Sequence, residues 1–111
     1  MPGKFELKKA KNGKFYFNLK AGNGEIILSS QMYADKRGAK NGIESVRKNS
    51  ASEEQFESLE DKNGNPYFVL KAKNKEVIGK SESYSSSSSM KKGIASVMRN
   101  GSESRVVEIE S

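Results

Sequence analysis

The side chains that could carry out chemistry in this 111-residue chain are lysine, tyrosine, serine and the carboxylates, because the chain has no cysteine and no histidine. This composition excludes thiol nucleophiles, imidazole acid–base catalysis and metal sites built on cysteine or histidine. Lysine can exchange protons with tyrosine or glutamate where burial or a neighbouring charge shifts a pKa. One such set occurs twice, as Tyr16, Lys20, Glu25, Ser30 and Tyr33 and as Tyr67, Lys71, Glu76, Ser81 and Tyr84.

The set occurs twice because the chain contains an internal repeat. A shift of 51 residues without a gap aligns 21 identical residues in 45 between positions 5–49 and 56–100. An active site seldom needs two intact copies in so short a chain, whereas a packing arrangement must recur wherever the folding unit recurs. We therefore predict that the protein is not an enzyme and that it has no catalytic residues, no cofactor and no metal site.

Each copy is predicted to begin with a three-stranded meander. In the first copy, apolar and polar residues alternate over 5–8 and 15–20 and a third apolar segment covers 25–28, with Asn-Gly pairs that suit tight turns between them. In the second copy the later of these turns reads Asn74-Lys75, and we expect Asn74 to supply its left-handed conformation.

A helix is predicted after each meander. Asp35 in the first copy and one of Ser85 to Ser87 in the second suit the N-cap position. Gly42 and Gly93 occupy the same place in the two helices, which indicates close packing of the helix on the sheet. The apolar stripe at helical spacing comprises Ala39, Gly42, Ile43 and Val46, and Met90, Gly93, Ile94 and Val97.

The tail resembles a third copy of the first strand, because Val107-Glu108-Ile109 has the phase of Phe5-Glu6-Leu7. We predict a single domain over 1–111, made of repeat 1 (about 4–50), repeat 2 (about 55–101) and a C-terminal strand or tail (102–111). Pro66 cannot donate to a ladder and should lie at the start of its strand or on an edge. The predicted core comprises Phe5, Leu7, Phe17, Leu19, Ile43, Val46, Phe56, Phe68, Leu70, Ile94 and Val97.

Charge is unevenly distributed along the chain. Twenty lysines and arginines against 14 acidic residues give a net charge of +6, but residues 51–61 carry five acidic groups and no basic one, between two basic segments. Strand alternation places Tyr16 and Lys20, like Tyr67 and Lys71, opposite the apolar stripe. These four residues are the candidate polyanion-binding site, because aromatic rings can stack on bases while lysines neutralise phosphates. A solvated, lysine-rich sheet face is the competing interpretation, and we favour it.

Three segments are distinctive together: Phe5-Glu6-Leu7, Asn12 to Ala21 with 63–72, and Gly42 to Val46 with 93–97. In these segments the chain resembles the YegP-like family of uncharacterised bacterial proteins. The resemblance implies an α+β fold in which two tandem β-β-β-α-β repeats share one antiparallel-rich sheet, exchange their last strands and place two helices on one face. It implies no activity and no ligand.

The sequence therefore predicts an architecture without identifying a biochemical function. The favoured hypothesis is a small non-catalytic accessory or interaction module with an unknown protein partner. The alternative is a weak polyanion or single-stranded nucleic-acid binder, and a third hypothesis is a small-molecule site at the pseudo-twofold interface. We expect a monomer with internal pseudo-twofold symmetry, a cytoplasmic location and no membrane association, because no apolar segment approaches the length of a span.

Overall fold

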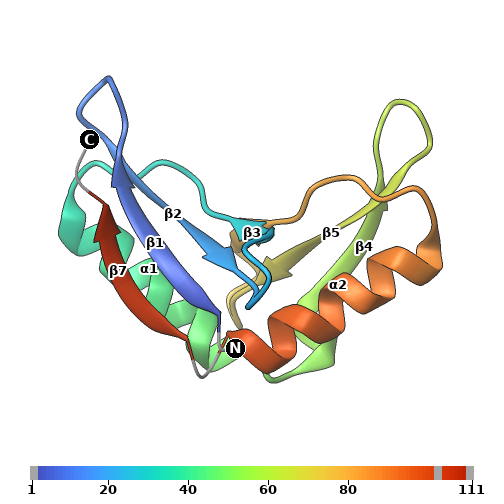
Figure 1. Ribbon diagram of the computed structural model, residues 1–111. Coiled ribbons are helices and arrows are strands. Elements are labelled where there is room, and N and C mark those ends of the chain that lie inside the picture. Colours follow the sequence, from blue (N-terminus) through green and yellow to red (C-terminus); the bar gives the residue numbers. More distant parts are fainter. Residues whose placement is uncertain (1–2, 102–103, 110–111) are drawn as a thin grey trace.

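The two meanders join edge to edge into one sheet, and both helices lie against one face of it (Figure 1). The computed structural model describes residues 3–101 and 104–109, and within them the sheet has seven strands in the order β4-β5-β6-β3-β2-β1-β7. The elements are β1 (Lys4–Lys9), β2 (Phe15–Lys20), β3 (Ile26–Ser29), α1 (Lys36–Asn49), the 3-10 helix η1 (Glu53–Gln55), β4 (Phe56–Glu60), β5 (Pro66–Lys71), β6 (Val77–Lys80), α2 (Ser87–Asn100) and β7 (Arg105–Ile109).

The predicted strand exchange is confirmed. β7 follows the helix of the second copy, yet it pairs with β1 of the first, with Phe5 opposite Val106 and Leu7 opposite Glu108. This pairing is parallel, whereas the other strand pairs are antiparallel. Each helix also contacts strands of both copies. Helix α1 contacts β5 and β6 as well as β2, and α2 contacts β2 and β3 as well as β5. The fold is therefore α+β with a mixed, mostly antiparallel sheet.

The tight turns confirm three of the four left-handed positions and correct the fourth. Gly13, Gly24 and Gly64 have φ values of 83°, 86° and 80°. At the remaining turn the left-handed residue is Lys75, with φ 73°, and not Asn74. The side chain of Asn74 instead accepts a hydrogen bond from the N–H of Glu76, so the turn uses the asparagine for its side chain and places the next residue in the conformation that glycine favours.

Both helices begin at the predicted caps. The carboxylate of Asp35 accepts a hydrogen bond from the N–H of Gly38, and the hydroxyl of Ser86 accepts one from the N–H of Ser89. Close packing at the helical glycines is confirmed as well. A β-carbon on Gly42 would overlap the Tyr33 hydroxyl, and one on Gly93 would overlap that of Tyr84 in the same way.

The core is continuous across the two copies but thinner at one side. Phe5, Phe17 and Phe68 are fully buried, together with the leucines of β2, β3 and β5. Phe56 and Ile94 were predicted to belong to this core, yet both are partly exposed, while their counterparts Phe5 and Ile43 are buried. The cause lies in the sheet order, because β7 covers the outer side of β1 and β4 is an edge strand.

Pro66 begins β5, as predicted, and its position explains why it is tolerated. In the first copy the N–H of Phe15 donates to the carbonyl of Tyr33, and the N–H of Tyr33 donates back to Phe15. In the second copy the N–H of Tyr84 donates to the carbonyl of Pro66 at 2.7 Å. The missing proline N–H therefore costs one bridging hydrogen bond and none between β4 and β5.

Equivalent positions of the two copies meet on the pseudo-twofold axis. Ser29 pairs with Lys80 between β3 and β6, and these positions are 51 residues apart. Beside them Leu28 packs on its own counterpart, Gly79, where a β-carbon would lie 2.6 Å from Leu28 Cγ. Gly101 likewise meets its counterpart Ser50, where a β-carbon would overlap the serine hydroxyl. At both places one copy has a side chain, and the other copy has a glycine that leaves space for it.

This arrangement predicts that Leu28 and Gly79 can be exchanged but not changed singly. Leu28→Gly should destabilise the protein by several kcal/mol, about the cost of emptying a leucine site, and Gly79→Leu by overpacking. The double variant restores one leucine and one glycine across the axis, so it should recover more than half of the summed loss of unfolding free energy. Urea denaturation of the four proteins measures this coupling, and additive losses would show that the two positions are independent.

Candidate interaction surfaces

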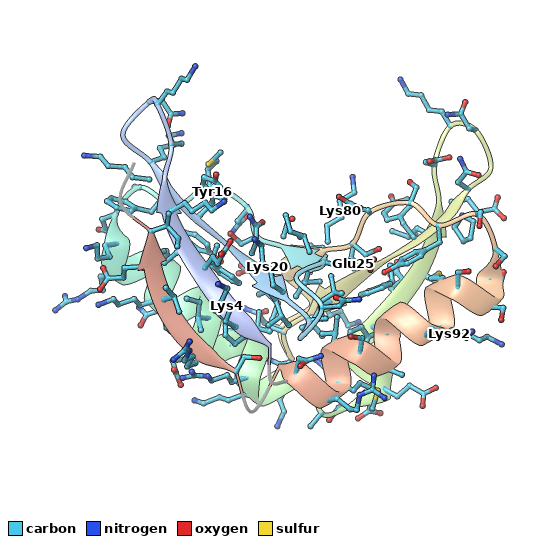
Figure 2. The ribbon with its side chains drawn as sticks, in the orientation of Figure 1. Lys4, Tyr16, Lys20, Glu25, Lys80 and Lys92 are labelled. Carbon is cyan, nitrogen blue, oxygen red and sulfur yellow. The ribbon has the colours of Figure 1, made fainter. Side chains whose placement is uncertain are left out.

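The four candidate residues lie on the sheet face opposite the helices. Tyr16 and Lys20 alternate along β2 with the buried Phe17 and Leu19, and the corresponding residues of β5 alternate in the same way. Figure 2 shows Lys20 and Lys80 near the middle of the molecule, between the two hairpins. Each tyrosine and its lysine are thus brought to one face, as alternation predicted. The ring of Tyr67 also makes a cation–π contact with Lys80, whose Nζ lies 5.0 Å from the ring centroid.

Both candidate lysines of this face, Lys20 and Lys71, have carboxylate partners. Lys20 Nζ lies 3.0 Å from Glu6 Oε1, and Lys71 Nζ lies 2.6 Å from Glu57 Oε2. Lys4 and Lys8 also contact Glu6, at 3.5 and 3.7 Å. Glu6 therefore lies among three lysines, which leaves an excess of positive charge beside β1. The carboxylates were not singled out in the sequence, although both stand at the same repeat position and could have been noticed on that ground.

Glu6 and Glu57 occupy equivalent positions in unlike surroundings. The side chain of Glu6 is 7% exposed and that of Glu57 is 43% exposed. Burial by itself would raise the pKa of Glu6, but the ion-pair contacts with Lys20, Lys8 and Lys4 outweigh it and hold that pKa below its ordinary value. A carboxylate stabilised in this way contributes to folding when it is ionised.

Glu6→Gln should consequently destabilise the protein at pH 7 by more than the about 1 kcal/mol that bounds an exposed ion pair, because it removes the negative charge that lies among three lysines. Because the folded-state pKa is lowered, the contribution is complete above the unfolded-state pKa and is lost as the pH falls through the folded-state value. The difference in unfolding free energy between wild type and variant should thus shrink on acidification below about pH 4. Glu57→Gln is the matched control and should cost less than about 1 kcal/mol. An equal cost at both positions would contradict the assignment.

A second surface lies at the outer side of β4, where the fold leaves a groove. The groove has a volume of about 380 Å³ and runs between β4 and α2. Its counterpart in the first copy lies between β1 and α1, where β7 is seated. The lining residues are Glu53, Phe56, Ser58, Met90, Lys91, Ile94, Ala95 and Met98.

The main chain of β4 is oriented to accept another strand. The N–H of Phe68 donates to Ser81 Oγ and its carbonyl accepts from the N–H of Ser81, so both groups point toward β6. Ser58 lies opposite Phe68, and in an antiparallel pair opposed residues either bond to each other or both turn away. The N–H and the carbonyl of Ser58 therefore point outward. In the first copy the same geometry turns Leu7 toward β7.

The α2 side of this groove is more apolar than the corresponding α1 side in the first copy. Ala95 replaces Glu44 and Met98 replaces Arg47 at the same repeat positions. Met98 and Ile94 of α2 are partly exposed. Sequence reasoning missed this groove because both helices show the same apolar stripe. The available signal was the departure from the repeat at the positions beside that stripe.

Neither surface shows the features of a catalytic or metal centre. Among residues 3–101 and 104–109, no three acidic side chains come together in a way that could hold a metal ion. Tyr33 and Tyr84 have pKa values raised by burial, which favours the neutral phenol. Within those same residues, neither helix is long and apolar enough to cross a membrane.

Comparison with known proteins identifies the family. The family model described as "Domain of unknown function (DUF1508)" matches residues 10–57 and again 61–108. The chain belongs to this DUF1508 family. Each match covers two strands, a helix and at least the beginning of the strand that follows, so the DUF1508 unit begins at β2 or β5 and β1 lies outside it.

Relatives of this DUF1508 protein extend over nearly its whole length. It is 64% identical over 99 residues to the UPF0339 protein YegP of Yersinia pestis, covering 89% of this chain and 88% of the relative. It is 49% identical over 106 residues to YegP of Escherichia coli K12, covering 96% of each. The solution NMR structures of the UPF0339 protein of Shewanella oneidensis and of E. coli YegP, described as a protein of unknown function, superpose with TM-scores of 0.92 and 0.93 at 48% and 47% identity. They cover 99% and 100% of this chain, and 93% and 96% of their own. The resemblance to YegP-like proteins is thereby confirmed.

Proposed function

We propose that this protein is a non-catalytic interaction module that binds a protein partner along the outer edge of β4. The observation that carries the proposal is the difference between the two copies: β7 covers the edge of β1, while β4 presents outward main-chain groups beside a partly exposed apolar groove. Addition of a strand to a free sheet edge is an established mode of peptide recognition. A cytoplasmic location, which the lack of cysteine favours, stays a prediction. The monomeric state stays a prediction as well.

The arrangement of the chemistry-bearing residues supports a non-catalytic role. Tyr33 and Tyr84 pack against the helical glycines. The hydroxyl oxygens of Ser30 and Ser81 accept hydrogen bonds of 2.9 Å from main-chain N–H groups of β2 and β5. Lys20 and Lys71 are in ion pairs with Glu6 and Glu57. Three of the five repeated positions, those of Lys20, Ser30 and Tyr33, thus have a folding role in each copy.

Ser58→Pro tests the edge directly. Proline removes the outward N–H of Ser58 and places its ring where an added strand would lie, but it removes no bond between β4 and β5. Immobilised wild-type protein should retain partner proteins from lysate treated with nuclease, and the variant should lose the same bands by at least tenfold. Retention that is unaffected by Ser58→Pro, in a variant whose folding is confirmed by circular dichroism, would contradict the proposal.

Polyanion binding at the open sheet face is the second candidate function, and the three lysines around Glu6 are the observation that favours it. Nonspecific attraction to a protein of charge +6 also weakens with salt, so salt dependence alone does not discriminate. Tyr16→Ala combined with Tyr67→Ala leaves the charge unchanged and removes stacking, which contributes about 1–3 kcal/mol per base where it occurs.

We expect this double variant to bind single-stranded nucleic acid as weakly as wild type does, since Lys20 and Lys71 are paired with carboxylates. Fluorescence anisotropy at physiological salt measures the two affinities. A folded double variant that loses tenfold or more in affinity would establish the second candidate in place of our expectation.

A further inference from the structure

The strand that covers the first copy shows what the groove of the second copy would require. Val106 packs on the core opposite Phe5, and Glu108 makes a 2.6 Å ion pair with Lys36 of α1. Arg47 Nη2 donates a 2.7 Å hydrogen bond to the carbonyl of Ser104. β7 is thus held by an apolar contact, a basic residue for its carboxylate and an arginine at its beginning.

Both of the basic anchors for β7 are absent from the corresponding places of the second copy. Ser87 stands at the position of Lys36, and Met98 stands at the position of Arg47. Ser58 replaces Leu7, so less of the groove is filled by the strand itself. A strand with a carboxylate at the position of Glu108 would find weaker partners here, whereas a segment with a large apolar residue opposite Ser58 would contact Met90 and Ile94, which line the groove.

The charge of β4 is also the reverse of that of β1. Lys4 and Lys8 of the first copy are replaced by Gln55 and Leu59, so within residues 3–101 and 104–109 Glu57 has an ion pair with Lys71 alone. Residues 51–61 carry five acidic groups and no basic group. In a sheet, directly opposed side chains of opposite charge attract and like charges repel.

We propose that the groove between β4 and α2 binds an extended, basic segment of another protein, parallel to β4, with apolar residues beside Phe56 and Ser58 and a lysine or arginine beside Glu57. This rests on the proposed function and adds the chemistry and direction of the partner. A second copy of the chain is disfavoured as the occupant, because pairing of two β4 strands would bring their acidic residues together and β7 carries Glu108 where an apolar residue is required.

The β7 sequence itself supplies a matched pair of probes. One peptide carries residues 104–109 with Val107→Lys and Glu108→Leu and one added C-terminal lysine, and the control peptide carries the unchanged sequence with the same added lysine. Titration of the labelled protein by NMR should shift the amide signals of residues 55–59 with the basic peptide. Its affinity should exceed that of the control by at least tenfold, and equal affinities would overturn the proposal.

Charge reversal on the protein provides the reciprocal test. Glu57→Lys should weaken binding of the basic peptide by at least tenfold and narrow or invert its advantage over the control. Glu25→Lys makes the same change in net charge at an exposed residue outside the groove and should leave the affinity within about twofold. Equal losses in both variants would reveal nonspecific charge attraction and overturn the proposal. A nitroxide at the N-terminus of the peptide should broaden signals near Gln55 more than those near Glu60, and the opposite gradient would overturn the parallel arrangement.

The two levels of the hypothesis fail separately. If Ser58-dependent capture of proteins persists but neither peptide binds the groove, the inferred partner chemistry is wrong and the proposed function stands. If wild-type protein self-associates in sedimentation equilibrium and Ser58→Pro abolishes the association, a second copy is the occupant and the inference is overturned. If neither capture nor peptide binding depends on Ser58, the proposed function fails as well.

Discussion

The meeting of equivalent positions on the pseudo-twofold axis is the constraint on which the rest of the structure depends. β3 and β6 pair around Ser29 and Lys80, and the single sheet exists because this junction closes. Two equal leucines at positions 28 and 79 could not both occupy the space there, and two glycines would leave it empty. The space is filled by a single side chain, that of Leu28, beside the glycine at position 79. Each helix can then contact strands of both copies, so the two halves are joined by helix packing as well as by the sheet.

The second departure from symmetry is at the outer edges. A repeat of 51 residues that exchanges its last strand would leave two equivalent edges, but the extra N-terminal strand β1 lies beside β2 and β7 lies beyond β1. β7 therefore covers the edge of β1, whereas β4 forms the opposite edge of the sheet and has no strand beyond it among the described residues. Edge strands of natural proteins are commonly protected by charge, and the acidic residues of β4 serve that purpose while they also select the charge of whatever binds.

Features that depend on nearby residues were predictable from the sequence. The turns with glycine at φ > 0, the caps at Asp35 and Ser86 and the alternation that separates Tyr16 from Phe17 all follow from local chemistry. The repeat in turn predicted a strand in the tail, and the resemblance to the YegP-like family implied its exchange. The partial exposure of Phe56 and Ile94 could not be predicted, because it depends on which strand lies outside β4 rather than on either residue. The ion pairs that engage Lys20 and Lys71 were missed for the same reason, since their partners lie on neighbouring strands.

The complementary pairs Leu28–Gly79 and Ser50–Gly101 also have a consequence for how such a gene can change. Tandem repeats in DNA are prone to recombination that deletes or adds a unit. A chain rebuilt from two first copies would set leucine against leucine at the axis, and one rebuilt from two second copies would set glycine against glycine. Neither product could close the sheet as this one does. The two halves are therefore not interchangeable at the pseudo-twofold axis.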